Sequence, residues 1–267
     1  MNYQTEIENF VIKGFENNNI SLITNQKHKF VLQNREENFV TKPTKKFKYH
    51  RWAGSLKSSQ AFAYNIFSGM NNSSLQFEFP MKVFDRDAQI DVMFENLNTQ
   101  TIELFEVKAF EINSLGVNKI SFEDKYFTKT QYKRSDIAGP FIEFLNKIII
   151  NFENQRIYGG GIKQLCSHLL GILNTMDKPY YVDKKFKLYS FCLDNPFSNK
   201  FQENSNSYKE SLIIFKGFVD EFLINLKVND RIEYCGFLSA TDYLKKNEKS
   251  FKRENFDYVM KRYFYKN

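Results

Sequence analysis

Alternating hydrophobic and polar residues predict three neighbouring strands in the first half of the chain. Hydrophobic side chains recur at every second position in residues 75–83, 89–96 and 101–110. A period of two is typical of a strand, because successive side chains point to opposite faces of the sheet. The polar segments 85–87 and 96–99 are typical of turns. The pattern therefore predicts an antiparallel meander of three strands with short connections.

Hydrophobic residues spaced three and four positions apart predict helices before and after this meander. The expected helices cover residues 3–17, 55–69, 137–152, 162–176 and 207–226, and Thr241 opens a last one. Gly159, Gly160 and Gly161 are expected to break the chain before the fourth helix. Short apolar segments at 188–193 and 233–237 predict two further strands. Together these elements predict an α/β fold with a central mixed sheet flanked by helices.

Two charged residues interrupt the apolar face of the third predicted strand. Glu106 and Lys108 are two positions apart, so they share that face with Ile102 and Leu104. Charges in such a place are costly unless they are paired or functional. Asp91 lies in the preceding strand and can meet them across the ladder. Two carboxylates and a lysine at the end of a sheet suit a hard divalent cation and a phosphate group.

The residues Asp91, Glu106, Val107 and Lys108 resemble the D…(D/E)xK signature of the PD-(D/E)xK nuclease superfamily, which has the restriction-endonuclease-like fold. The resemblance covers roughly residues 50–180, and no proline precedes Asp91. It implies a Mg²⁺- or Mn²⁺-dependent DNA endonuclease, of the kind that acts in restriction or defence. Asp91, Glu106 and the backbone carbonyl of Val107 would be the metal ligands. Lys108 would orient or deprotonate the attacking water, or stabilise the pentavalent phosphorus.

Three alternatives to a nuclease remain open. One is an ordinary exposed hairpin whose Glu106 and Lys108 pair with each other. Another is a catalytically inactive nucleic-acid-binding module on the same fold, and a third is a metal-dependent hydrolase of other phosphate esters. The presence of Asp91, Glu106 and Lys108 together argues against an inactive copy. The basic segments of the chain favour long polyanions over small esters.

Two of the expected helices contribute further candidate residues. Gln60 lies in the middle of the apolar stripe of the second helix, so its amide either finds partners in the core or faces the site. Gln164 and His168 share the face opposite to the core stripe of the fourth helix. They resemble the Gln-xxx-Tyr helix that follows ExK in the branch including RecB-type nucleases, which implies a catalytic Gln164. Solvent exposure is the alternative for both, and His50 is a phosphate contact or an ordinary surface histidine.

The chain has a net charge of +7 and contains two strongly basic segments. Residues 26–57 (the basic segment below) carry nine Lys or Arg against two Glu, which accounts for all seven charges. Residues 245–266 carry eight cations against three anions, interleaved with Phe and Tyr. Such segments suit a polyanion, although a solvated basic surface is the alternative. DNA is the predicted partner, with contacts from Gln60 and from Lys45, Lys46, Lys48, Arg51 and Lys125.

The length of 267 residues, with 42% hydrophobic content, suffices for one large folded unit. We expect an N-terminal helix and basic arm in residues 1–49, and a nuclease domain with a C-terminal extension in residues 50–267. Three dispersed cysteines, an N-terminus without an apolar signal and the lack of an apolar run of spanning length predict a cytoplasmic protein without membrane contact. A homodimer is expected, because proteins that cut both strands are commonly two-fold.

Overall fold

The structure, a computed structural model, describes residues 3–24, 30–113, 120–153, 155, 159–195 and 197–265. Lys27 and Lys29 of the basic segment lie outside the described residues. The strands are β1 (Gln76–Lys82), β2 (Asp87–Asn96), β3 (Thr101–Lys108), β4 (Lys185–Cys192) and β5 (Ile232–Ser239). The helices are α1 (Tyr3–Glu16), α2 (Ser59–Phe67), α3 (Ser135–Phe152), α4 (Gly159–Leu173), α5 (Asn199–Asn225), α6 (Ala240–Asn247) and α7 (Arg253–Tyr263).

The five strands form one mixed sheet in the order β1-β2-β3-β4-β5. The pairs β1–β2 and β2–β3 are antiparallel, whereas β3–β4 and β4–β5 are parallel. Helices α3 and α4 connect β3 to β4, and α5 connects β4 to β5, as parallel neighbours require. The predicted α/β class, the mixed sheet and the opening meander are therefore confirmed.

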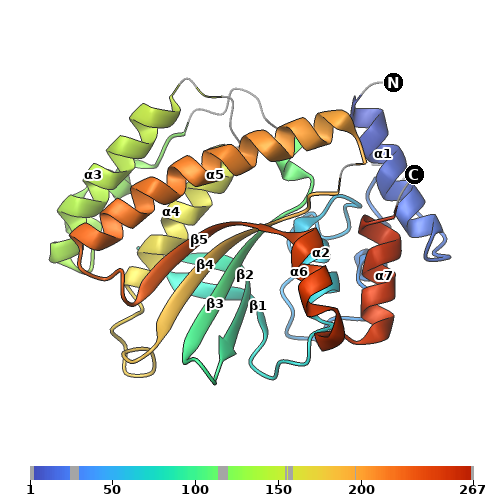
Figure 1. Ribbon diagram of the computed structural model, residues 1–267, viewed down its shortest axis with the longest axis horizontal. Helices are drawn as coiled ribbons and strands as arrows, with labels where there is room; N and C mark the ends of the chain where they lie inside the picture. The colour runs from blue at the N-terminus through green and yellow to red at the C-terminus, as the bar shows by residue number, and fades with distance from the viewer. Residues whose placement is uncertain are drawn as a thin grey trace.

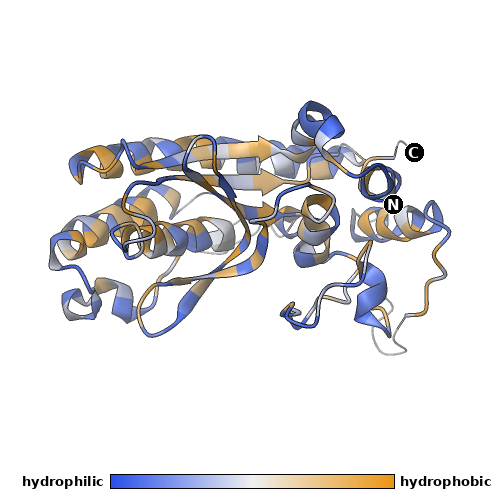
Figure 2. Ribbon diagram, turned by 90° about the horizontal axis from the view of Figure 1, so that it is seen from below, coloured by the Kyte–Doolittle hydropathy of each residue, from blue (hydrophilic) through white to orange (hydrophobic). Residues whose placement is uncertain are grey.

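Helices cover both faces of this sheet (Figure 1). On one face Leu104, Leu188 and Tyr234 lie side by side in register, and α4 and α5 pack on this face of the sheet. On the other face Phe105 packs against Phe67 of α2, with ring centroids 5.0 Å apart. Coloured by hydropathy, the helices show alternating apolar and polar bands, as expected when each buries one side (Figure 2).

Helix α4 begins earlier than the sequence predicted. Gly159, Gly160 and Gly161 form its first turn and do not break the chain. Each glycine costs a helix about 1 kcal/mol relative to alanine, but the apolar stripe that follows is fully buried and outweighs this cost. A further glycine, Gly171, lets α4 approach β1, since a Cβ there would lie 2.8 Å from Cβ of Met81.

Other boundaries also differ from the sequence prediction. Helix α2 begins at Ser59 after the N-cap Ser58, and α5 begins at Asn199, two turns earlier than expected. The single C-terminal helix expected from Thr241 is two helices, α6 and α7. Cys166 and Cys192 are buried free thiols, whereas Cys235 is partly exposed. Within the described part of the chain, no helix is long and apolar enough to cross a membrane.

The basic segment has little regular structure, and one buried asparagine holds it. Nδ2 of Asn38 donates to the carbonyls of Ala53 (2.6 Å) and Ser55 (2.7 Å). Arg262 of α7 donates to both oxygens of Asn38, at 2.7 Å for the backbone carbonyl. The guanidinium of Arg262 also lies 4.1 Å from the ring centroid of Phe15. The C-terminal helix therefore fixes the position of the basic segment.

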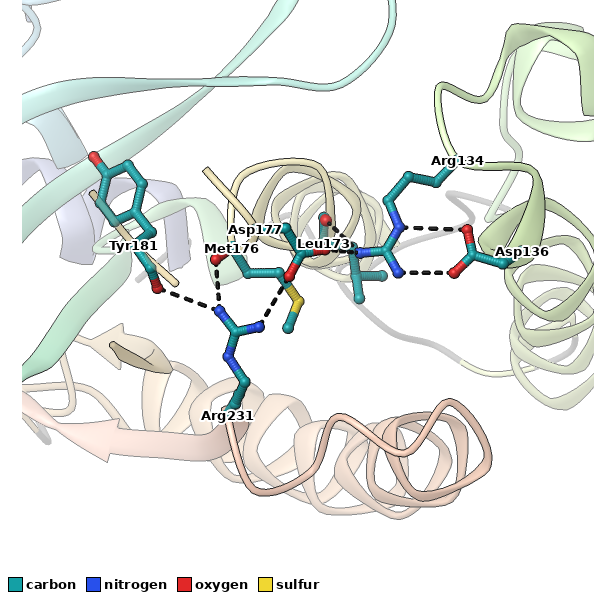
Figure 3. Close-up of polar contacts among 7 residues, drawn as sticks. All are labelled: Arg134, Asp136, Leu173, Met176, Asp177, Tyr181 and Arg231. Carbon is teal, nitrogen blue, oxygen red and sulfur yellow. Dashed lines mark hydrogen bonds and ion pairs between the residues drawn. The ribbon is translucent and has the colours of Figure 1, made fainter. Parts of the chain in front are cut away.

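An ion network links the C-terminal end of α4 to the start of β5 (Figure 3). Arg231 donates to Asp177 at 2.9 Å, and Arg134 pairs with Asp177 at 2.6 Å and with Asp136 at 2.7 Å. Arg134 also donates to the carbonyl of Leu173, the last residue of α4. A cation at this end of a helix satisfies carbonyls that lack helical partners. The network thus anchors α4 where β4 and β5 begin, at the opposite end from the site described next.

Candidate functional site

Three carboxylates lie in one row across the meander. The row is at the end of the sheet where α2 contacts β2 and β3. Val92 of β2 pairs with Phe77 of β1 and with Phe105 of β3. One position further toward the same end of the sheet, each of the three strands carries an acid. These acids are Glu78, Asp91 and Glu106. Facing positions of antiparallel strands bring side chains within reach of each other. The predicted meeting of Asp91 with the Glu106 strand is confirmed, and Glu78 joins them.

The strands β2 and β3 separate at this row. Their ladder ends at the pair of Val92 and Phe105, and the N–H of Val107 donates at 2.7 Å to Oδ2 of Asp91. In an antiparallel pair the N–H and C=O of one residue face the same neighbour. The Val107 carbonyl therefore faces the same gap as the Asp91 carboxylate. Asp91 takes the place of a backbone acceptor and fixes the geometry of the gap.

Glu106 is a buried anion with two side-chain partners. Its carboxylate is 1% exposed; Lys108 contacts one oxygen, and Nε2 of His168 lies 2.6 Å from the other. Burial alone would raise the pKa of Glu106, but the charge of Lys108 and the contact with His168 outweigh burial and lower it well below its usual value. Glu106 therefore stays ionised, held by β3 and by α4.

The contacts of His168 define its tautomer. Nδ1 of His168 is buried and has no hydrogen-bond partner among the described residues. Since Glu106 is ionised and can only accept, Nε2 must carry the proton and donate. His168 is 2% exposed, so the solvent-facing alternative is wrong for this residue.

The pKa values of Asp91 and Glu78 are raised, whereas that of Glu106 is lowered. Burial, followed by the charge of Glu106, raises the pKa of Asp91 well above its usual value, and Lys108 offsets only part of this. Burial also raises the pKa of Glu78, against the hydrogen bond from Gln60. The backbone φ of Glu78 is +53°, a strained value for a strand residue. Mutual repulsion and backbone strain at one place are typical of functional sites.

Gln60 uses its whole amide to join the basic segment to the row of acids. Its Oε1 accepts from the N–H of His50 at 2.8 Å, and its Nε2 donates to the carbonyl of Lys48 at 2.9 Å. Nε2 also donates to Oε1 of Glu78 at 2.8 Å. The buried amide in the apolar stripe of α2 therefore caps backbone groups and also faces the site. Both of its predicted roles are present.

A cavity of about 480 Å³ opens beside the row of acids. It brings together Asp91, Lys108, Gln60 and the exposed Gln164, as the sequence predicted for the two glutamines. The other lining residues are His50, Trp52, Ser55, Lys57, Ser58, Ser59, Glu78, Gln89 and Glu111. A second cavity of about 290 Å³ shares Gln89 and Gln164 with the first and reaches His168 and Lys125. The two cavities are therefore neighbours, and together they are called the cleft below.

The predicted basic contacts lie in different places around this cleft. Lys45, Lys46, Lys48 and Arg51 are exposed. The backbone of Lys48 touches Gln60 at the cleft wall. Lys125 lies in the second cavity, where its ammonium is 3.0 Å from Glu123 and 3.7 Å from Asp85. His50, exposed and lining the first cavity, is placed to meet a phosphate or solvent.

Sequence reasoning missed two acids of the site. Glu78 lies between Phe77 and Phe79, so alternation placed it on a polar outer face of β1. Glu111 follows β3 and accepts from the N–H of Ala109 at 2.9 Å. The strand register would have revealed Glu78, because its position faces Asp91. No pattern in the sequence specifies that register.

The donor set fits a hard divalent cation in kind and in charge. Asp91 and Glu106 offer carboxylate oxygens. Burial and then the charge of Glu106 raise the pKa of Asp91, and a bound cation would offset both effects by favouring the charged carboxylate. Among the described residues no group of three or more His, Cys, Asp or Glu is arranged to hold a metal ion. A cation would share the oxygens of Glu106 with Lys108 and His168, since each carboxylate oxygen has two lone pairs.

Comparison of the chain with protein-family models, with curated proteins and with solved structures finds no match in any of the three. Function is therefore inferred from the chemistry of the site.

Proposed function

We propose that this chain is a metal-dependent nuclease of the PD-(D/E)xK type, hydrolysing phosphodiester bonds in DNA on a restriction-endonuclease-like fold. The observation that carries the proposal is the convergence of Asp91, Glu106 and Lys108 where β2 and β3 separate, beside a cavity. The antiparallel meander followed by parallel strands is consistent with that fold. A homodimer stays a prediction.

Asp91, Glu106 and the carbonyl of Val107 would hold Mg²⁺ or Mn²⁺. Such an ion, when bound, neutralises the scissile phosphate and lowers the pKa of water. Glu106 holds the ammonium of Lys108 in place, since the two side chains are in contact and both are buried. Lys108 lines the cavity, where its charge acts on the attacking water or the developing phosphorane. His168 of α4 holds the Glu106 carboxylate in position through its Nε2 atom.

The cavity wall also suits a phosphate group. Helix α2 begins at the cavity, and the side chain of its N-cap Ser58 accepts from the N–H of Ala61 at 3.2 Å. The amino end of a helix carries partial positive charge and favours an anion. Lys57 adds a full charge at the same wall. Lys45, Lys46 and Lys48 of the basic segment are exposed and lie outside the cavity lining.

A hydrolase of smaller phosphate esters is the second candidate. The cavity of about 480 Å³ favours it, because this volume lies within the range of small-ligand sites, about 300–1,000 Å³. The exposed Lys45, Lys46 and Lys48 do not line the cavity and would have no role with a small ester. They do have a role with a long polyanion, so the nuclease is the preferred proposal.

Incubation with supercoiled plasmid tests the proposal. With Mg²⁺ we expect nicked and linear products, whose sequenced ends report specificity, and EDTA should abolish cutting. A parallel assay with bis(4-nitrophenyl) phosphate separates the two candidates. Rapid turnover of this ester with an intact plasmid would contradict the nuclease and support the second candidate.

A further inference from the structure

Trp52 is an exposed aromatic residue at the rim of the candidate site. It is 46% exposed and lines the same cavity as Asp91 and Lys108. Scattered exposed hydrophobic residues are normal on protein surfaces. Among the exposed large hydrophobic side chains of the described residues, however, Trp52 is the one that lines this cavity. It is also the single tryptophan of the chain.

A tight turn fixes the backbone that carries this indole. The N–H of Ala53 donates to the carbonyl of His50 at 3.0 Å, and that of Ser55 donates to the carbonyl of Trp52 at 2.9 Å. The backbone N–H of Trp52 donates to Nδ1 of His50 at 3.3 Å. Ala53 is fully buried, and Asn38 binds its carbonyl at 2.6 Å. The ring is therefore carried by an anchored backbone, which reduces the entropy lost when a ligand stacks on it.

The surroundings of Trp52 suit a nucleobase attached to a phosphate chain. The guanidinium of Arg51 lies 5.2 Å from the ring centroid, and Lys57 lines the same cavity. An aromatic face beside cations is the arrangement by which proteins bind single strands, with bases on the ring and phosphates on the charges. Within a duplex both faces of a base are already stacked, so an indole can take only an unpaired base.

We propose that Trp52 is a stacking platform for an unpaired base, and that the site therefore acts on single-stranded DNA, such as an end, a flap or a gap. The inference rests on the proposed nuclease function and names its substrate class. The cavity volume agrees with this, since about 480 Å³ accommodates one or two nucleotides rather than a length of double helix. The base lies on Trp52 while its phosphate enters toward Lys108.

The fluorescence of Trp52 reports this contact directly, because no other tryptophan contributes. In EDTA, which prevents cutting, the protein is titrated with dT12, with an abasic strand of equal length and with a 12-base-pair duplex. Binding of each is measured separately by the anisotropy of a labelled strand. We expect dT12 to quench the emission as it binds, and the abasic strand and the duplex to bind without quenching.

Variants give the matching energetic test. Trp52→Ala should weaken binding of dT12 by about 5- to 160-fold, since one stacked base contributes about 1–3 kcal/mol. Binding of the abasic strand should change less than twofold, and Trp52→Phe should keep most of the affinity. Tyr180→Ala removes another exposed aromatic, 62% exposed and outside both cavities, and should change nothing.

Equal quenching by the duplex and dT12, or unchanged dT12 affinity in Trp52→Ala, would overturn the proposal. These results are separate from the plasmid assay. If the plasmid is cut but dT12 does not change the tryptophan emission, the stacking role alone is overturned. Quenching by dT12 without cutting supports the platform and contradicts the nuclease, and an absence of all binding together with an intact plasmid overturns both.

Discussion

Nε2 of His168 lies 2.6 Å from the buried carboxylate of Glu106, across 62 positions of sequence. Lys108 contacts the other oxygen of the same carboxylate. An unpaired buried carboxylate would be expensive, so these two contacts explain why an anion persists in the core beside β3. Through His168, helix α4 fixes the orientation of the Glu106 side chain.

His168→Ala should therefore destabilise the protein. Loss of the donor leaves one oxygen of a buried carboxylate unsatisfied, and hydrogen bonds to charged groups contribute about 1.5–3 kcal/mol. We expect the free energy of unfolding at pH 7, measured with urea, to fall by that amount. His168→Gln keeps an N–H donor and should recover part of the loss. Equal stability of wild type and His168→Ala would mean that the contact carries no energy.

Asp91→Asn should stabilise the protein at pH 7 in the absence of divalent cations. The folded state raises the pKa of Asp91 above its unfolded value of about 3.9, because of burial and Glu106. An acid with a raised pKa favours folding below its unfolded pKa, and this contribution is lost as the pH rises through the folded pKa. At pH 7 the charged Asp91 therefore opposes folding. The penalty is about 1.4 kcal/mol for each unit by which the folded pKa exceeds the unfolded pKa.

Urea unfolding in EDTA checks this at pH 7 and at pH 3.5, where the difference from wild type should shrink. Asp87→Asn, which changes an exposed acid of the same strand, is the matched control and should change little. Mg²⁺ should stabilise the wild type more than Asp91→Asn, since binding to the folded state raises stability. A variant less stable than wild type at pH 7 would contradict the prediction.

Much of the fold was predictable because it depends on local pattern. Period-two alternation gave β1, β2 and β3 nearly to the residue, and the spacing of Glu106 and Lys108 located two side chains of the site. The buried Gln60 was also predictable, since an amide in an apolar stripe requires partners. These inferences need only the neighbours of a residue along the chain.

The missing parts depend on tertiary contacts. Glu78 looked like an outward polar residue of β1, because the register that places it opposite Asp91 is set by long-range pairing. His168 was assigned to the polar face of its helix, but α4 buries that side against β3 as well. The glycines of α4 suggested a break, because local helix propensity does not include the energy of tertiary packing.

Replacement of the exposed lysines Lys45, Lys46 and Lys48 by alanine should weaken DNA binding through electrostatics alone. Each lysine that neutralises one phosphate contributes about 0.9 to the slope of log K against log[salt], so the triple variant should lose about 2.7. Anisotropy titrations at several salt concentrations measure this. The same change at Lys200, Lys209 and Lys216 of α5 is the control. An unchanged slope in the first variant would mean that these lysines do not contact DNA.

Gln60→Leu should destabilise the protein, because the N–H of His50, the carbonyl of Lys48 and the carboxylate of Glu78 all lose a partner. Buried unsatisfied groups cost roughly 1–3 kcal/mol, and urea unfolding measures the loss. Gln164→Ala, at an exposed amide of the same cavity, should stay within about 0.5 kcal/mol of wild type. Equal effects of the two variants would show that the bridge from Gln60 is unimportant.

The single-turnover rate of DNA cleavage by Lys108→Ala, at saturating Mg²⁺, tests the proposed mechanism most directly. An ammonium beside the reacting phosphate acts on the transition state, and loss of one such contact typically lowers the rate by about 10²–10³. Lys108→Ala should therefore bind DNA as wild type does yet cut it at least a hundredfold more slowly at every Mg²⁺ concentration. Lys187→Ala, at a sheet lysine paired with Glu233, should cut normally. Cutting by Lys108→Ala at the wild-type rate would contradict a nuclease site built on Asp91, Glu106 and Lys108.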